Sequence, residues 1–166
     1  SIAEPHASVS RNGILVHTSA AARYSRLVWY DLRSGATSVL AIGPYFDPKL
    51  SPDGSRIAVE RAEGTGRSNL WMIDARTGAA EPWSHAPELN RKPIWSPAGD
   101  SILFASNRSG SYAMYVRDAA GSGPERVAFA PARALLMWPN DWRAGGRITF
   151  DLYEPGSGYN VYELRA

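Results

Sequence analysis

The chain has 166 residues, of which 44% are hydrophobic and 20% are charged, with 6 Trp, 8 Tyr, 4 Phe, 15 Gly, 12 Pro and no Cys. This composition excludes a disordered or collagen-like chain, and the absence of Cys excludes disulfides, thiolate metal sites and cysteine nucleophiles. The 18 basic and 16 acidic residues are scattered, with Arg91-Lys92 the only adjacent basic pair, so we expect no nucleic-acid partner.

Four copies of one pattern follow each other along the chain, and each copy is a turn followed by an alternating apolar run. The copies begin at Ser10, Ser51, Ser96 and Trp142. Their glycines (Gly13, Gly54, Gly99 and Gly145) are spaced 41, 45 and 46 residues apart. A period of roughly 40 to 50 residues with several short strands per unit indicates a β-propeller.

The turn in the second copy shows why the pattern favours a hairpin. Pro52 sets the φ angle of a type I turn, Asp53 can accept backbone hydrogen bonds, and Gly54 tolerates the positive φ that closes the turn. We expect a first strand before each turn, over residues 45–50, 92–95 and 136–141, and a second strand after it, such as residues 56–60.

A third strand lies about twenty residues later, over residues 27–31, 70–74, 113–118 and 160–164. In the first three copies it ends in Asp31, Asp74 or Asp118, and each Asp leads to a Gly, so we expect its carboxylate to accept hydrogen bonds from the turn. We expect a weaker fourth strand over residues 37–40, 80–84 and 125–129. Trp and Tyr at repeated positions are expected to pack between neighbouring sheets.

These motifs resemble the TolB-type propeller repeat, through Ser-Pro-Asp-Gly at residues 51–54, its variant at 96–99, the Leu-Trp strands and the Asp-to-Gly turns. The likeness is greatest to the C-terminal propellers of bacterial eukaryotic-like serine/threonine kinases and related membrane-anchored signalling proteins, through residues 8–10, 27–31 and 48–54. The resemblance implies a periplasmic or other extracytoplasmic location. Similar blades occur in Tol-system proteins, peptidase gating domains and polysaccharide-degrading enzymes, so the repeat specifies fold more than function.

We therefore predict an all-β fold of β-propeller blades, each a four-stranded antiparallel sheet, in a single domain over residues 1–166. The approximate blades are residues 1–43, 44–89, 90–133 and 134–166. The last blade departs from the pattern, because residues 142–145 read Trp-Arg-Ala-Gly and the sequence stops after the third strand. We expect the ring to be completed by a longer chain or by a second copy in a dimer; a four-bladed closed ring, with residues 2–5 as the missing strand, is the competing arrangement.

No catalytic constellation appears in the sequence. There is no Gly-x-Ser-x-Gly elbow, zinc-binding His-Glu-x-x-His, phosphate loop or dinucleotide fingerprint, and His6, His17 and His85 occupy different places in the repeat. His85 with Glu88 is the only local His and carboxylate pair, and a surface loop explains it. We predict no catalytic residue, no metal and no cofactor. No charge-free run, such as residues 34–46, is long enough for membrane insertion.

We predict a binding role for the loops that join second to third strands and one blade to the next, which share one end of a propeller. We call this end the loop face. Arg and Tyr are enriched at binding hot spots, and the candidate binding residues on the loop face are Arg23, Tyr24, Arg61, Arg67, Arg91, Arg108, Arg133 and Tyr153. The partner class would be an acidic or carboxylate-bearing protein, peptide or glycan.

The leading hypothesis is a non-enzymatic sensor or interaction module of a bacterial signalling or envelope protein. The alternatives are an accessory propeller of a prolyl oligopeptidase-like peptidase, and a polysaccharide-degrading propeller enzyme. A kinase domain or a Gly-x-Ser-x-Gly domain in the flanking gene sequence would separate the first two. The third would need a central cluster of His and carboxylate side chains with bound metal.

Overall fold

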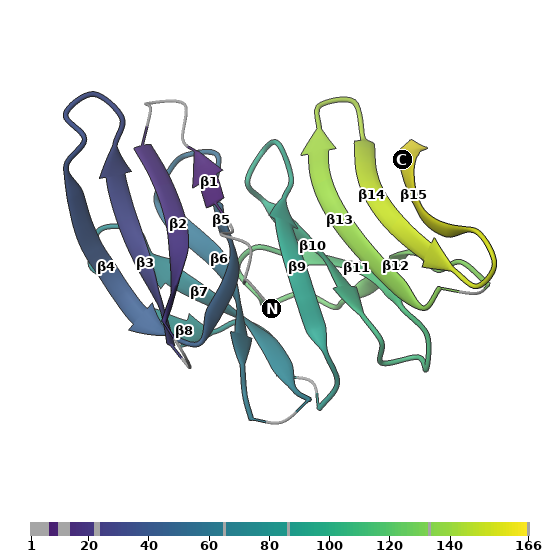
Figure 1. The fold of residues 1–166 in the computed structure, drawn as a ribbon. Helices are drawn as coiled ribbons and strands as arrows, with labels where there is room; N and C mark the ends of the chain where they lie inside the picture. The colour runs from purple at the N-terminus through teal and green to yellow at the C-terminus, as the bar shows by residue number, and fades with distance from the viewer. Residues whose placement is uncertain are drawn as a thin grey trace.

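The protein is built entirely from β-strands in the computed structural model, which describes residues 7–9, 14–21, 24–64, 66–85, 87–132 and 134–165. Four antiparallel sheets follow one another along the chain (Figure 1). Each sheet uses strands in sequence order, so every connection within a sheet is a hairpin. Within the described ranges there is no helix that is long and apolar enough to cross a membrane.

The strand bounds define the four sheets as four blades. Blade 1 contains β1 (Ala7–Val9), β2 (Ile14–Ala21), β3 (Tyr24–Asp31) and β4 (Thr37–Gly43). Blade 2 contains β5 (Tyr45–Leu50), β6 (Arg56–Ala62), β7 (Ser68–Asp74) and β8 (Ala80–Pro82). Blade 3 contains β9 (Asn90–Trp95), β10 (Ser101–Ser106), β11 (Ala113–Asp118) and β12 (Arg126–Phe129). Blade 4 contains β13 (Leu136–Arg143), β14 (Arg147–Glu154) and β15 (Gly158–Arg165).

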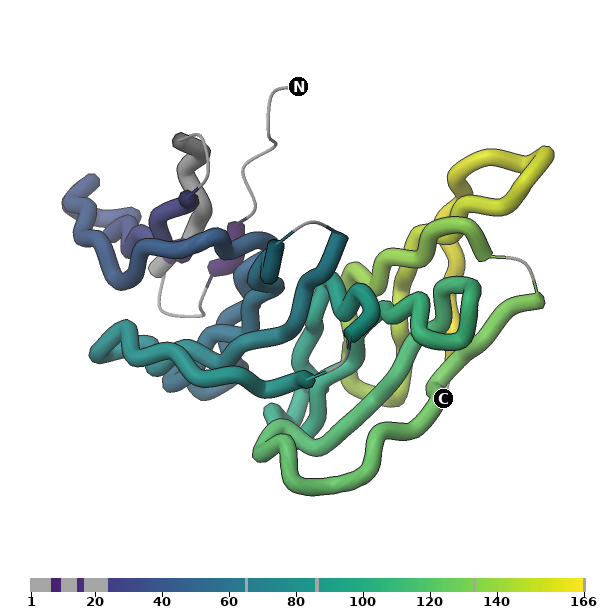
Figure 2. The backbone as a smooth tube through the Cα atoms, turned by 90° about the horizontal axis from the view of Figure 1, so that it is seen from below, coloured from purple at the N-terminus to yellow at the C-terminus, as the bar shows by residue number. Residues whose placement is uncertain are grey.

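The blades stand side by side along an open arc, which Figure 2 shows from below. The first strands β1, β5, β9 and β13 contact one another in succession and form the inner side of the arc. The prediction of an all-β fold of propeller blades with an incomplete last blade is confirmed. Residues 2–5, the candidate closing strand of a four-bladed ring, lie outside the described residues.

The turns form as their residue types predict. Gly54 and Gly99 have φ angles of 76° and 77°, which L-residues with a side chain rarely adopt. The Asp53 carboxylate accepts hydrogen bonds from the Ser51 hydroxyl at 2.6 Å and the Ser55 amide at 3.0 Å. In blade 3, where Ala98 replaces the Asp of the motif, Asp100 accepts the bond from the matching serine, Ser96, at 2.8 Å.

The three aspartates that end the third strands cap the turns that follow them. Asp31 accepts from the amides of Arg33 and Ser34, both at 2.8 Å. Asp74 accepts from the amides of Arg76 at 3.0 Å and Thr77 at 2.7 Å. Asp118 accepts from the amides of Ser122 and Gly123. The predicted structural role of these three carboxylates is confirmed.

The fourth strands differ most from their expected bounds. β4 continues past residue 40 to Gly43, and β12 begins at Arg126. β8 ends at Pro82, two residues early, because the amides of Trp83 and Ser84 both donate to the Leu70 carbonyl, at 2.9 and 3.1 Å. In a regular ladder two successive amides do not share one acceptor, so the pairing of β8 with β7 stops there.

The core consists of three apolar clusters, one between each pair of neighbouring blades. Tryptophans tie the blades together, as expected: the indole N–H of Trp29 donates to the Ala75 carbonyl at 3.2 Å, and that of Trp95 to the Lys49 carbonyl at 2.8 Å. Trp71 differs, since its ring lies under the Arg61 guanidinium of its own blade, 4.0 Å from the ring centre.

Candidate binding site at the inner strands

The inner strands carry a repeated X-Pro pair that changes the direction of one side chain per blade. Asp47 precedes Pro48 and Lys92 precedes Pro93, and these are the two non-glycine residues with positive φ among those described, at 49° and 54°. The pairing register shifts at both places, as it does in a β-bulge, which re-aims a side chain. Pro has no N–H to donate to a ladder, but it costs no ladder bond here because the bulge leaves its position unpaired.

Two ion pairs join blade 2 to blade 3 beside these bulges. The Lys92 Nζ lies 2.6 Å from Asp47 Oδ1, and the Arg91 Nε lies 2.9 Å from Glu60 Oε1. The carboxylate side chains are 8% and 5% exposed, whereas those of Lys92 and Arg91 are 29% and 37% exposed. The acids are therefore buried beneath the bases, and a ligand that approaches meets the cations first.

Burial sets the electrostatics of this cluster. Loss of water raises the pKa of the Glu60 carboxyl above its ordinary value, and the nearby Asp47 acts in the same direction, against the attraction of Arg91. A carboxylate that is costly to bury needs its cation, so Arg91 is held over Glu60. The cluster is preorganised by charges that neither blade could bury alone.

Aromatic rings complete the site, which we call the inner-strand pocket: Phe46, Asp47, Glu60, Arg91, Lys92 and Trp138. These residues surround a cavity of about 190 Å³. The cations of Arg91 and Lys92 lie 5.8 and 5.9 Å from the centre of the Trp138 ring, a distance at which cation–π attraction acts. Tyr112 supports that ring edge-on at 5.5 Å, and Phe46 is 42% exposed.

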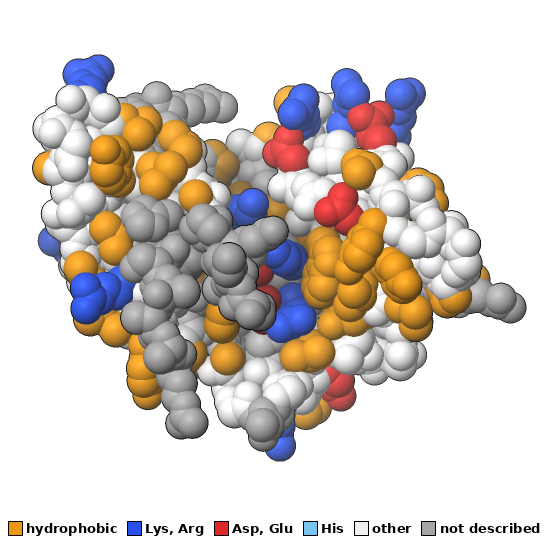
Figure 3. Space-filling view, in the orientation of Figure 1, with side chains coloured by type: hydrophobic (Ala, Val, Ile, Leu, Met, Phe, Trp, Pro, Cys, Tyr) orange, Lys and Arg blue, Asp and Glu red, His pale blue; other side chains and the backbone are white. Residues whose placement is uncertain are grey.

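Figure 3 shows one face of the molecular surface, in the orientation of Figure 1. Basic and acidic side chains gather at the middle of the view, beside a hydrophobic area over blade 4. A guanidinium offers five N–H donors and an ammonium three, and Glu60 and Asp47 each take one in the bonds described above. The pocket can thus hold a polar group against Arg91 and Lys92 and an apolar group against Phe46 and Trp138.

The structure separates the predicted loop-face residues into groups. Arg23 and Arg133 lie outside the described residues. Arg67 is exposed, and Tyr24 is 62% exposed. Tyr153 packs on Tyr159, with ring centres 4.9 Å apart.

The remaining three arginines contact other residues of the propeller, Arg61 and Arg108 within their own blades and Arg91 across to blade 2. The Arg61 guanidinium lies over Trp71, as described above. Arg108 donates to Asn90 Oδ1 at 2.8 Å, pairs with Glu125 and lies over Tyr115, 4.5 Å from the ring centre. Only Arg91 belongs to both the predicted loop face and the inner-strand pocket.

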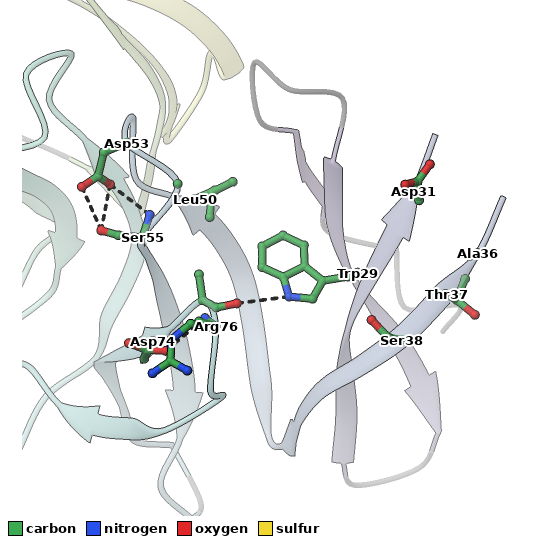
Figure 4. A pocket seen from close by; sticks show the side chains of 12 residues that line it. Trp29, Asp31, Ala36, Thr37, Ser38, Leu50, Asp53, Ser55, Asp74 and Arg76 are labelled. Carbon is green, nitrogen blue, oxygen red and sulfur yellow. Dashed lines mark hydrogen bonds between the residues drawn. The ribbon is translucent and has the colours of Figure 1, made fainter. Parts of the chain in front are cut away.

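A larger cavity, of about 720 Å³, lies between blades 1 and 2 (Figure 4). Trp29 and Leu50 line it together with Asp31, Asp53 and Asp74. These carboxylates accept the turn hydrogen bonds described above. The cavity is therefore the space between the turns of two neighbouring blades. No group of three or more His, Cys, Asp or Glu side chains among the described residues could hold a metal ion.

Sequence reasoning missed five of the six pocket residues. Asp47, Lys92 and Trp138 each precede a Pro in a first strand, at spacings of 45 and 46 residues. An X-Pro pair that keeps the period of the repeat was the available signal, because Pro in a strand marks a bulge or an edge. Glu60 and Phe46 carry no such signal.

Comparisons with known proteins agree with the architecture. A family model described as the TolB β-propeller domain matches residues 2–148. Similar relatives include the uncharacterized peptidase YuxL of Bacillus subtilis, 31% identical over 102 residues, which are 58% of this chain and 16% of that protein. The Tol-Pal system protein TolB of Alcanivorax borkumensis is 33% identical over 67 residues, which are 40% of this chain and 15% of that protein. The chain thus spans about a sixth of the length of these curated relatives.

Solved structures show the same fold at lower identity. Puromycin hydrolase superposes with a TM-score of 0.67 at 20% identity, over 98% of this chain and 27% of that one. The β-propeller domain of the Trilobed protease from Pyrococcus furiosus, which has an open velcro topology, superposes with a TM-score of 0.65 at 17% identity, over 97% of this chain and 54% of that one. Four consecutive blades, the repeated turns and a family model that matches most of the chain lead to one conclusion: this chain belongs to the TolB β-propeller domain family.

Proposed function

We propose that this chain is a non-catalytic binding module that holds a carboxylate-bearing partner, protein or peptide, at its loop face, with the inner-strand pocket as the centre of the contact. The observation that carries the proposal is the layered charge of the pocket. The partly exposed cations of Arg91 and Lys92 lie over two buried carboxylates. Two aromatic rings line the same pocket. Exposed Arg67 and Tyr24 would extend the contact outward.

A binding measurement with a defined probe tests the proposal. The probe is a fluorescein-labelled, C-terminally amidated dodecapeptide rich in Glu, and its control is the same peptide with Lys in place of Glu. We expect fluorescence anisotropy to show tighter binding of the Glu peptide, and the Arg67→Glu variant to weaken it several-fold, because reversing a charge at the rim of a contact slows association. Arg76→Glu is the matched control, because the β7–β8 turn lies at the opposite end of β7 from the β6–β7 loop. Equal binding of the two peptides would refute the proposal.

The larger protein that carries this module is part of the proposal. The kinase-like sequence motifs favour a signalling protein with the propeller outside the cytoplasm. A second candidate, an accessory propeller of a peptidase, is favoured by the identity to YuxL and by the fold shared with puromycin hydrolase. Coding sequence on either side of residues 1–166 distinguishes them: a kinase domain with a membrane span supports the first, and a Gly-x-Ser-x-Gly domain supports the second.

A further inference from the structure

We propose that the inner-strand pocket binds the C-terminal residue of a peptide, with the free α-carboxylate on Arg91 and Lys92 and an apolar side chain against Phe46 and Trp138. This inference rests on the proposed function, because it names the part of the partner that the same site would hold. Three features of the pocket support the inference: its accessible cations, its volume and its place on the inner strands.

The accessible charges of the pocket suit an anionic group. Lys92 and Arg91 are the accessible members of their ion pairs, while Asp47 and Glu60 lie beneath them. A carboxylate placed on the cations adds charge-assisted hydrogen bonds to donors that the buried acids leave over.

The size of the pocket selects one residue. Its volume of about 190 Å³ is below the roughly 300–1,000 Å³ of cavities that hold drug-sized ligands. One apolar side chain with its terminal carboxylate fits this space, and the rest of a longer peptide would lie outside it. The exposed ring of Phe46 and the ring of Trp138 line the same pocket as the cations and provide apolar contact there.

The pocket lies where the inner strands depart from regular geometry. It lies on the inner strands β5, β9 and β13, where the backbone is held at positive φ at Asp47 and Lys92. Backbone strain of this kind persists where the surrounding structure enforces it, and it often accompanies ligand contacts. Both strained residues project their charged ends into one ion pair at the pocket.

Calorimetric titration of the 166-residue chain with short peptides tests the inference. The probes are acetyl-Ala-Ala-Phe with a free carboxylate, the same peptide as its amide, and acetyl-Ala-Ala-Ser with a free carboxylate. We expect the free acid of the Phe peptide to bind at least tenfold more tightly than its amide and than the Ser peptide. A fourth probe, Ala-Ala-Phe with a free amine and a free carboxylate, should bind as tightly as its acetylated form, because a free amine has no part in the site.

Two variants tie the binding to the pocket. The double variant Asp47→Asn with Lys92→Gln removes both charges of this ion pair, and the preference for the free acid should disappear. Phe46→Ser alters an exposed ring and should abolish the preference for Phe over Ser. Unfolding curves confirm that each variant is folded.

Three outcomes separate this inference from the proposed function. If acid and amide bind equally and Phe46→Ser weakens both, the end-group assignment is wrong and the binding function stands. If the free amine strengthens binding, the buried carboxylates are the recognition groups and the inference is overturned. If none of these peptides binds and the Glu-rich peptide of the previous test also fails, both proposals fall.

Discussion

The turn carboxylates connect single residues to the stability of the whole array. Hydrogen bonds from the Ser51 hydroxyl, and then from the Ser55 amide and hydroxyl, lower the pKa of Asp53 to about 2. Asp31, Asp74, Asp100 and Asp118 also have lowered pKa values, in each case because turn donors bond the charged form. A carboxylate with a depressed folded-state pKa stabilises the fold above its unfolded pKa of about 3.9, and that stability is lost as the pH falls toward 2.

We predict that Asp53→Asn reduces the free energy of unfolding at pH 7 by about 1 kcal/mol or less, because the carboxyl is solvent-exposed. The difference from the wild type should shrink between pH 4 and pH 2, as the wild-type carboxylate becomes protonated. Urea unfolding of the wild type and the variant, at pH 7 and at pH 2.5, measures the difference in unfolding free energy at each pH. A difference in unfolding free energy of the same size at the two pH values would mean that Asp53 acts through its shape and not through its charge.

Single residues also mark the limit of what the sequence predicts. Asp53, Gly54 and Asp74 could be assigned from local turn chemistry, because their partners lie within five residues along the chain. The pairs of Asp47 with Lys92 and of Glu60 with Arg91 join residues 45 and 31 positions apart. Predicting them requires the register of one blade against the next, which the residue pattern of a single strand does not contain.

At the scale of elements, the β7–β8 turn shows how closely two blades approach. Gly78 has φ of 75°, and a Cβ built on it would lie 2.2 Å from the Leu40 carbonyl oxygen of blade 1. Gly121, at the same place in blade 3, would put a Cβ 3.2 Å from the Trp83 ring of blade 2. The Asp-to-Gly turn of each of these blades is therefore part of the contact with the blade before it.

We predict that Gly78→Ala destabilises the fold more than Gly54→Ala. Both positions have positive φ, for which a side chain costs about 1–2 kcal/mol, but a Cβ at Gly54 would have nothing within 4 Å. The additional loss in Gly78→Ala measures the backbone shift between blades 1 and 2. Equal unfolding midpoints in urea would show that blade 1 moves away at no cost, and so packs loosely on blade 2.

Elements were predicted well where their pattern depends on local residues, and less well where it depends on neighbours. The strand from Tyr45 to Leu50 has its expected bounds because a turn motif limits it on one side. β8 is shorter than expected, since Trp83 leaves the strand line and its indole donates to the Ala119 carbonyl of blade 3 at 3.2 Å. That contact between blades overrides the local preference for a longer strand.

For the whole molecule, the face at the blade 4 end of the arc carries charged side chains at a register where blades 2 and 3 are apolar. In blades 2 and 3, one cross-strand pair at the same register faces the following blade and is apolar: Ala58 with Met72, and Leu103 with Val116. In blade 4 the pair at this register is Thr149 with Glu163. Arg147 bonds Glu163 at 2.7 Å and Arg165 bonds it at 3.0 Å. A further blade on this side would have to bury these charges, which costs free energy unless it supplies partners.

The edge of blade 4 provides the last prediction. Among the described residues no strand lies beyond β15, whereas β7 and β11 are covered by β8 and β12. If the charged face discourages association, the chain is a monomer near 18.1 kDa, and the outward amides of β15 exchange hydrogen faster than those of β11. Light scattering and hydrogen exchange measure the two quantities on one sample. A mass near twice that value together with protected β15 amides would contradict this expectation, because it would mean that a second copy covers the edge and completes the ring.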